Sequence, residues 1–440
     1  MATFYIDPTV SGTGTGTFGD PYKSWASIAF FAAGNTYLQK AGTTFFGTIT
    51  VNVGGSSEAT RVIVGSYDPV TGAATTNKAF IDASTSGNLR GLRVAGSVNF
   101  VTVQDLDIVG GNGVGIRTCM DAGSSGSKAN NLKCLRLRLH DVQSSGANVS
   151  GGLNFYSDDA VVEDCEIFNI GDDGMYGEGL RPRIWRNRIY DVSQSNNVAG
   201  DPIQLNGNCS GFSVCYNDLT QPKYLKQVFI CSGASLGSGG LFAHNICRMP
   251  TGTTGSGSVK NVFNDQPGVT IQGNVIIGGD HGIWLDGTTP DCRIISNVVM
   301  HAWQGIVSNG GTNVIANNTV LYSTDQGFRV FTGGGTPTIT NNIAAYCGVG
   351  IAAIGTITKT TNCYFSNTTN FLSLGSGGSI EGSAVTQDPR VQSDGGIPAS
   401  SPCATAGTYV SGVTLANGRL RPGFVPIGAY MAVLPRTVRV

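Results

Sequence analysis

Asparagine recurs at nearly even spacing from residue 187 to residue 362, in most cases in a segment of the form apolar-x-x-Asn-x-apolar. IWRNRI, IQGNVI and ITNNIA are examples, and successive asparagines lie 20 to 30 residues apart. The series is Asn187, Asn217, Asn245, Asn274, Asn297, Asn318, Asn342 and Asn362. Earlier in the chain Leu106, Leu137 and Cys165 keep the same register. A recurring period of this length indicates a solenoid in which each repeat forms one coil.

The length of the repeat suits three short strands joined by turns. Asparagine tolerates the left-handed backbone conformation that a tight bend needs, and its amide can hydrogen-bond to the same amide in the next coil. Only 12% of the residues are charged and 64 are glycine, which is typical of many short strands and turns. The sequence therefore predicts an all-β fold, a single-stranded right-handed parallel β-helix, because crossovers between parallel strands are right-handed.

A second strand lies between successive asparagines and alternates in character. Period-two alternation places one set of residues inside the coil and their neighbours on the surface. The predicted inward residues are Leu153, Met175, Ile203, Val228, Val262, Ile283, Ile306 and Phe328. Because stacked coils repeat every ~4.8 Å, the outward residues should form surface columns.

Composition excludes several classes of function. A net charge of -1 gives no general reason to expect nucleic-acid binding. No stretch reaches the roughly 20 apolar residues of a membrane span, so no membrane insertion is expected, and the start MATFYIDPTV lacks a signal peptide. The eleven cysteines have no CxxC spacing. We therefore expect them to be buried apolar residues, with neither disulfides nor a zinc site.

The outward columns mix aromatic, amide and charged side chains. Aromatic rings stack on the apolar faces of sugars, while amides and charged groups bind hydroxyls, so this stripe suits a groove for a sugar polymer. A stripe buried in an oligomer is the alternative, since exposed aromatic rings are costly. The candidate substrate-binding residues are Tyr156, Tyr176, Asn206, Phe229, Phe263, Trp284, Lys226 and Lys260.

Carboxylates on the same stripe are candidates for acid and base catalysis. Glycoside hydrolysis needs two carboxyl groups, one protonated and one ionised. Coil stacking places Asp173 beside Asp201 and Asp265 beside Asp286, and two such close carboxyls push one pKa upward. The full candidate catalytic set is Glu178, Asp173, Asp201, Asp265, Asp286 and His281. Each aspartate could instead cap a turn.

The coils between Asn187 and Asn274 are longer than the later ones, so extra loops are expected near 193–199, 221–225 and 250–257, where Lys223 and Tyr224 would add contacts. A lyase would use a different set of groups. Its base would be Lys226, Lys260, His281 or Tyr176, with a cation neutralising the substrate carboxylate. Asp172, Asp173 and Asp201 could hold Ca²⁺, although no acidic loop repeats, and no other cofactor is expected.

Both ends of the chain resemble proteins of the pectate-lyase-like β-helix superfamily. FYIDPTVSGTGTGTFGDPYKSWAS resembles the opening of such proteins, and SPCATAG with RPGFVPIGAY resembles their closing segment. The resemblance implies a capping helix over Ser24 to Ala33. It also implies a cap with the first strands over 1–50, coils over 51–370, and a closing segment over 371–440 packed on the helix.

GDDG and GDHG, which contain Asp173 and His281, are similar to pieces of the polygalacturonase pattern. That family's Asn-Thr-Asp and Arg-x-Lys elements are missing, so its residue roles are not transferred.

The preferred interpretation is a polysaccharide-binding and polysaccharide-cleaving β-helix that is similar to bacteriophage tailspike depolymerases. This resemblance implies a homotrimer that binds a bacterial surface polysaccharide and cleaves it as a glycoside hydrolase. The chain would then lie in the virion tail or outside the cell. The alternatives are a lyase acting on uronic-acid polymers, a non-catalytic glycan-binding adhesin, and a structural solenoid whose stripe is an assembly surface.

The implied homotrimer is testable by size. Light scattering of the purified protein should give the mass of three chains. A monomer at micromolar concentration would count against the tailspike interpretation.

Overall fold

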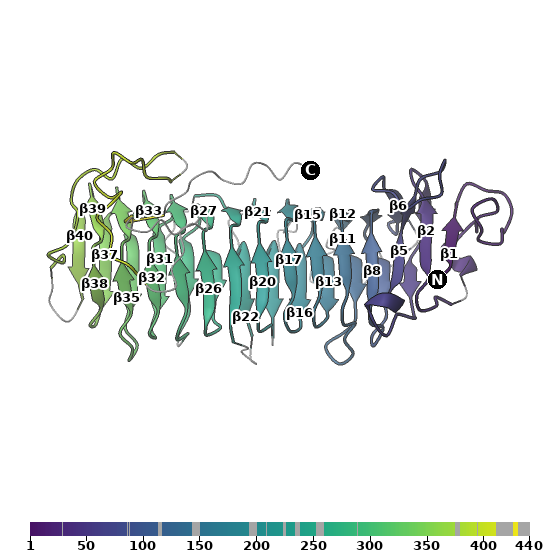
Figure 1. The fold of residues 1–440 in the computed structure, drawn as a ribbon, viewed down its shortest axis with the longest axis horizontal. Helices are drawn as coiled ribbons and strands as arrows, with labels where there is room; N and C mark the ends of the chain where they lie inside the picture. Colours follow the sequence, from purple (N-terminus) through teal and green to yellow (C-terminus); the bar gives the residue numbers. More distant parts are fainter. Residues whose placement is uncertain are drawn as a thin grey trace. The chain divides into compact units, whose positions relative to one another are not determined.

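The computed structural model describes residues 1–28, 30–85, 87, 89–112, 117–142, 150–192, 200–207, 209–222, 226–233, 238–251, 259–287, 289–374, 379–393, 395–410 and 426–429. The chain divides into two compact units, Met1–Cys209 and Ser210–Val440. Each unit is a stack of β-coils whose strands belong to three parallel sheets, which we name A, B and C (Figure 1). Helix in the described residues is limited to two 3₁₀ turns, η1 (Trp25–Ser27) and η2 (Glu58–Thr60).

In the first unit, strands that are neighbours in a sheet come from successive coils. Sheet A holds β1 (Thr3–Ile6), β2 (Thr36–Lys40), β5 (Val62–Tyr67), β8 (Val101–Gln104), β11 (Lys133–Leu135), β14 (Val161–Glu163) and β17 (Arg183–Trp185). Sheet B holds β3 (Thr44–Phe46), β6 (Ala79–Asp82), β9 (Leu106–Val109), β12 (Arg138–Val142), β15 (Glu166–Ile170) and β18 (Arg188–Tyr190). Sheet C holds β4 (Ile49–Val51), β7 (Arg90–Val94), β10 (Arg117–Ala122), β13 (Ser150–Tyr156), β16 (Met175–Glu178) and β19 (Ile203–Asn206).

The second unit follows the same order of strands. Sheet A holds β20 (Phe212–Cys215), β23 (Gly240–Ala243), β26 (Val269–Gln272), β29 (Arg293–Ile295), β32 (Val314–Ala316), β35 (Thr338–Thr340) and β38 (Thr358–Thr360). Sheet B holds β21 (Asp218–Thr220), β24 (Ile246–Arg248), β27 (Val275–Ile277), β30 (Val298–Met300), β33 (Thr319–Leu321), β36 (Ile343–Ala345) and β39 (Cys363–Phe365). Sheet C holds β22 (Phe229–Ser232), β25 (Lys260–Asn264), β28 (His281–Leu285), β31 (Gln304–Asn309), β34 (Gln326–Phe331), β37 (Val349–Ile354) and β40 (Thr369–Ser373).

This arrangement is the predicted right-handed parallel β-helix. The chain returns to each sheet once per coil and pairs in parallel, for example β13 with β16 and β28 with β31. The core lies inside the coils, where the eight predicted inward residues of the second strand are all fully buried. These residues are Leu153, Met175, Ile203, Val228, Val262, Ile283, Ile306 and Phe328. The fold and seven of these inward positions are therefore confirmed. Val228 is also buried, but the residue in register with the inward Val262 is Phe229.

The turn between sheets A and B differs from the prediction in one respect. The residue directly before each asparagine of the recurring series has the left-handed backbone conformation, and the asparagine itself does not. Arg186, Tyr216, His244 and Asn317 have φ values of 57°, 61°, 57° and 56°. The bend is thus made one residue earlier, and the asparagine that follows it turns its side chain inward.

The predicted amide ladder is present in the second unit. Asn297 Oδ1 accepts from the backbone N (3.0 Å) and the Nδ2 (2.9 Å) of Asn274 in the coil before it. Asn297 Nδ2 donates to Asn318 Oδ1 (3.0 Å) and to Ile271 O (2.9 Å). The ladder residues Asn274, Asn297 and Asn318 are 0% exposed. Their polar atoms are therefore satisfied entirely by protein, as a buried amide requires.

The cysteines behave as predicted. All eleven are buried and none forms a disulfide. Burial raises the pKa of the Cys119 and Cys134 thiols well above their usual value, so these groups stay neutral.

The helix expected over Ser24 to Ala33 is wrong for the described residues. Ser24 Oγ accepts from Ala26 N (3.1 Å) and caps only the single turn η1, after which Ile28 is extended. Trp25 and Phe31 are buried instead in a cluster of rings, with the Phe31 and Tyr37 centroids 4.6 Å apart. Aromatic packing, not a helical face, covers this part of the first coils.

The described part of the last segment packs on sheet B of the second unit. Ile397, Cys403 and Ile427 share one buried cluster with Leu321 and Ile343. The backbone there is also held, because Asn317 Nδ2 donates to Pro426 O (2.8 Å) and Ala429 N donates to Thr319 Oγ1 (2.9 Å). No helix among the described residues is long and apolar enough to cross a membrane.

Removing one rung should test the ladder. Asn297→Ala leaves two buried donors of Asn274 without an acceptor, and we expect a loss of about 3–5 kcal/mol in unfolding free energy. Asn309→Ala is the matched control, since Asn309 is only half-buried, and it should change stability by less than about 1 kcal/mol. Urea unfolding followed by circular dichroism measures both. Equal losses would show that the buried amides contribute nothing specific.

Candidate functional site

Sheet C of the second unit carries a cluster of predicted site residues. In β25 and β28, Lys260 lies opposite His281 and Phe263 lies opposite Trp284. Val262 and Ile283 alternate with them and point into the core. Strand alternation therefore fixes the two rings on the outer face of neighbouring coils.

Lys260 lies over both rings of this face. Its Nζ is 4.9 Å from the Phe263 centroid and 5.0 Å from the Trp284 centroid, which is cation–π geometry. Burial lowers the pKa of Lys260 and the charge of Lys226 adds to this effect, while Asp286 opposes it. The ammonium group is thus held among rings with one carboxylate nearby.

Asp265 and Asp286 directly follow positions that are paired between β25 and β28. Asn264 lies opposite Leu285, so the two carboxyl groups come from adjacent coils. Trp284 Nε1 (3.3 Å) and Gly287 N (3.0 Å) donate to Asp286 Oδ1. Asp265 Oδ1 is buried and has no hydrogen-bond partner among the described residues. Burial, reinforced by the charge of Asp286, raises the pKa of Asp265 to about 6.

His281 is 1% exposed and lies beneath two tryptophans. Its ring centroid is 4.3 Å from that of Trp284 and 5.6 Å from that of Trp303. Trp303 is absent from the predicted set because it precedes β31, and the strand alternation that predicts outward residues does not extend to it. The sequence signal that could have identified Trp303 is its position directly before the first residue of β31.

A second cluster lies on sheet C of the first unit. Tyr176 OH donates to Glu178 Oε1 (2.7 Å), and Asn206 Nδ2 donates to Tyr176 OH (2.9 Å). The rings of Tyr156 and Tyr176 are 6.0 Å apart. Burial, together with the charge of Glu178, raises the pKa of both phenols, so they act as neutral donors. Four predicted site residues are therefore brought together.

Asp121 and Arg90 extend this cluster and were not predicted. Asp121 lies opposite Asn154, which lies opposite Tyr176. Arg90 Nε donates to Asp121 Oδ2 (2.5 Å), and burial raises the pKa of Asp121. The alternation of RTCMDA, which puts Met120 inside, was the signal that would have placed Asp121 on the surface.

The outward placement of Phe229 is wrong. Phe229 pairs with Val262 and is 0% exposed, so it belongs to the core and cannot contact a ligand. Cys231, two residues further along the same strand, is also fully buried. The error came from VFICS, where Val228 and Phe229 are both apolar and either could have been the inward residue.

The remaining predicted residues lie at the start of sheet C strands. Asp173 and Asp201 stack as expected, since Asp201 N donates to Asp173 Oδ1 (2.8 Å), but they are only 5% and 3% exposed. Lys226 is exposed. The predicted loop residues 193–199, 223–225, which include Lys223 and Tyr224, and 252–257 lie outside the described residues.

Comparison with known families gives one partial match. The profile of NosD, the periplasmic copper-binding protein, matches residues 242–380, which is less than half of the chain. Among the described residues, no group of three or more His, Cys, Asp or Glu side chains could hold a metal ion. No curated protein sequence matches the chain significantly.

Solved structures share the fold. The complex of XylC with xylose matches with a TM-score of 0.54 and 9% identity, covering 98% of both chains. The PL6 family alginate lyase AlyGC matches with a TM-score of 0.55 and 13% identity, covering 89% of this chain and 54% of that one. The chain thus spans about half the length of that lyase. The Dettilon tailspike protein gp208 matches more loosely, with a TM-score of 0.42 and 13% identity over 81% of this chain and 68% of the other. At these identities the first two likenesses show a common parallel β-helix fold, and the third carries no argument.

Proposed function

We propose that the chain binds a polysaccharide on sheet C of the second unit and hydrolyses it with Asp265 and Asp286. The observation that carries this proposal is the pair of carboxyls on adjacent coils, of which Asp265 has a pKa raised to about 6. Two carboxyls with different tasks are what glycoside hydrolysis requires.

Asp265 suits the role of general acid. A carboxyl group with a raised pKa keeps its proton in mildly acidic solution and can donate it to the glycosidic oxygen as the C–O bond breaks. Asp286, held by Trp284 Nε1 and Gly287 N, suits the second role. It would either take a proton from water or attack the anomeric carbon, and water supplies the hydroxyl of the new reducing end.

The rings and Lys260 supply the binding surface. Trp284 and Phe263 stand one coil apart; Trp284 is partly exposed and can stack on a sugar ring, while Phe263 is 9% exposed and supports it from the neighbouring coil. Lys260 places a cation above them, where it would bind hydroxyl or carboxylate oxygens of the chain being cleaved. XylC in complex with xylose and the alginate lyase AlyGC are the solved relatives that favour a sugar ligand in general terms.

A polysaccharide lyase is the second candidate. The lowered pKa of Lys260 favours it, because a desolvated amine is a better base for the proton next to a uronic acid carboxylate. A lyase product carries a new carbon–carbon double bond that absorbs ultraviolet light, whereas a hydrolase product carries only a new reducing end.

We further propose that the substrate is a bacterial surface glycan and that the chain assembles as a homotrimer in a phage tail. The end motifs of the sequence support this proposal only in general terms, because they resemble the pectate-lyase-like β-helix superfamily, which includes phage tailspikes among other proteins. A glycan-binding adhesin without catalysis would use the same surface.

Amide substitutions should separate catalysis from binding. Asp265→Asn and Asp286→Asn should each lower turnover of bacterial surface glycan by at least about 100-fold, because each removes one proton-transfer group or nucleophile. Binding should change little. Asp291→Asn is the control, since its left-handed backbone (φ 61°) accepts asparagine.

The assay counts new reducing ends over time. If Glu178→Gln abolishes turnover while Asp265→Asn does not, the reaction belongs to the first unit. If none of the three variants loses activity, the carboxylate mechanism is wrong.

The raised pKa of Asp265 also predicts a dependence of stability on pH. The folded protein binds more protons than the unfolded chain between the ordinary value of 3.8 and about 6, so this carboxyl lowers stability as pH rises through that window. Asp265→Asn should therefore raise the melting temperature at pH 7 to 8 by about 1–2 °C, a small effect because the half-buried charge is partly screened. Near pH 4 the difference should vanish. A lower melting temperature at pH 8 would show that the ionised carboxylate is stabilising.

A further inference from the structure

Three aromatic rings form a continuous column at the turn between sheets B and C of the second unit. His301 and Tyr322 stack with centroids 5.1 Å apart and planes inclined by 8°, and Tyr322 and Tyr346 stack at 5.1 Å and 12°. Phe365 meets Tyr346 edge-on at 5.6 Å. The rings come from successive coils, so the stacking follows the coil repeat.

The backbone at these positions is unfavourable for aromatic residues. His301, Tyr322 and Tyr346 all have φ of 58°, a conformation that asparagine, aspartate and glycine adopt at least cost. The corresponding turns of the first unit hold Asp141 and Asn169 instead. Mutual stacking offsets part of this cost. Yet Tyr322 and Tyr346 remain 45% and 42% exposed, so the column also presents a surface to solvent.

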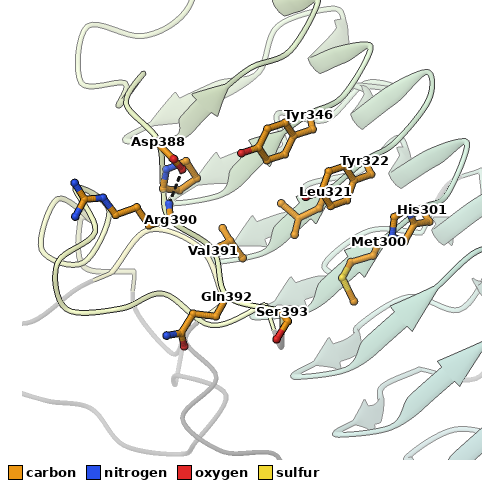
Figure 2. A pocket seen from close by; sticks show the side chains of 11 residues that line it. Met300, His301, Leu321, Tyr322, Tyr346, Asp388, Arg390, Val391, Gln392 and Ser393 are labelled. Carbon is orange, nitrogen blue, oxygen red and sulfur yellow. Dashed lines mark hydrogen bonds between the residues drawn. The ribbon is translucent and has the colours of Figure 1, made fainter.

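Hollows lie on both flanks of the column. One has a volume of about 330 Å³ and lies between the rings and residues 388–393, as Figure 2 shows. The other, of about 580 Å³, is lined by the same three rings together with residues such as Thr324 and Thr368. Each volume is in the range of small-molecule sites. The three rings therefore form a ridge between two cavities.

The lining of the first hollow combines an apolar floor with a polar rim. Leu321 and Val391 lie at its floor, and Asp388 and Gln392 belong to its wall (Figure 2). Arg390 does not bring its charge inside, because its guanidinium points away from the rings and Nη1 donates to Ser400 O (3.2 Å). Among the described lining residues, the charged group that faces the rings is the Asp388 carboxylate, whose Oδ1 accepts from Arg390 N (2.8 Å). Such a lining disfavours anions.

From this geometry we propose that the ridge of His301, Tyr322 and Tyr346 is a binding site for an uncharged oligosaccharide that crosses it, with sugar units in both hollows. Ring edges and tyrosine hydroxyls face the ligand, and the Asp388 carboxylate accepts hydrogen bonds from its hydroxyls. The site binds without cleaving, since the described lining holds a single carboxyl. It is separate from the pair Asp265 and Asp286 and does not depend on their activity.

Isothermal titration calorimetry on the full chain tests the site with cellohexaose, maltohexaose and mannohexaose, and with a hexamer of guluronate as the anionic probe. At least one neutral hexamer should bind. Tyr322→Asn and Tyr346→Asn should weaken that binding at least tenfold, while Trp284→Ala on sheet C should leave it unchanged. Asparagine suits the left-handed backbone at both positions, so these variants should fold, as a melting curve will show.

Tyr216→Asn is the matched control. Tyr216 stacks on His244 at 5.1 Å and 11°, has φ of 61° and is 37% exposed, but it lines neither hollow. Its replacement should leave the affinity unchanged. The proposal is overturned if no neutral hexamer binds, if Trp284→Ala abolishes binding while Tyr346→Asn does not, or if Tyr216→Asn weakens it equally. Tighter binding of the guluronate hexamer that is lost in Tyr346→Asn would overturn the assignment of an uncharged ligand.

Discussion

The buried amide column is the interaction on which the second unit depends. Within the column, Asn297 accepts two hydrogen bonds from Asn274 of the previous coil and donates two, one to the amide of Asn318 and one to a backbone carbonyl. These bonds are made only when the coils are in register, because a shift of one residue would bury unsatisfied amides. The ladder therefore fixes which residues lie opposite each other on all three sheets.

Because the coils are aligned in this way, residues that lie one coil apart in the sequence lie side by side on the same sheet. Asp265 and Asp286 affect each other only because β25 and β28 are aligned, and Lys260 reaches both rings for the same reason. The column of His301, Tyr322 and Tyr346 arises in the same way at a different turn. A parallel β-helix can thus display several independent surfaces, each repeating with the coil and each carrying its own side chains.

Much of this arrangement could be predicted from the sequence, and the failures have identifiable causes. The recurring asparagines predicted the coils. A polar residue rarely returns to the same place in successive apolar segments unless the same turn is repeated. Alternation then placed Leu153 and Ile283 inside without ambiguity. It failed at VFICS, where Val228 and Phe229 are both apolar and the strand starts one residue later than assumed. Trp303 and the left-handed residues were not predicted because they lie in turns, where the two-residue alternation of a strand does not apply.

The candidate site was harder to predict than the fold. Sequence spacing brought Asp265 and Asp286 together, but the raised pKa depends on burial, which spacing does not report. Asp173 and Asp201 are also one coil apart, yet both are almost completely buried. The helix expected over Ser24 to Ala33 failed because the resemblance on which it rested does not encode how Trp25 and Phe31 pack.

The last rung of the ladder is not an amide. The backbone N and Nδ2 of Asn362 donate to Glu381 Oε1, and Tyr364 OH donates to the other carboxylate oxygen. An asparagine there would offer its own NH₂ outward, where a further coil from the same or another molecule could accept it. A carboxylate only accepts, so the series of donors ends with it. Glu381 thus ends the amide column, because its carboxylate accepts the last two hydrogen bonds and has no N–H to donate to a further coil.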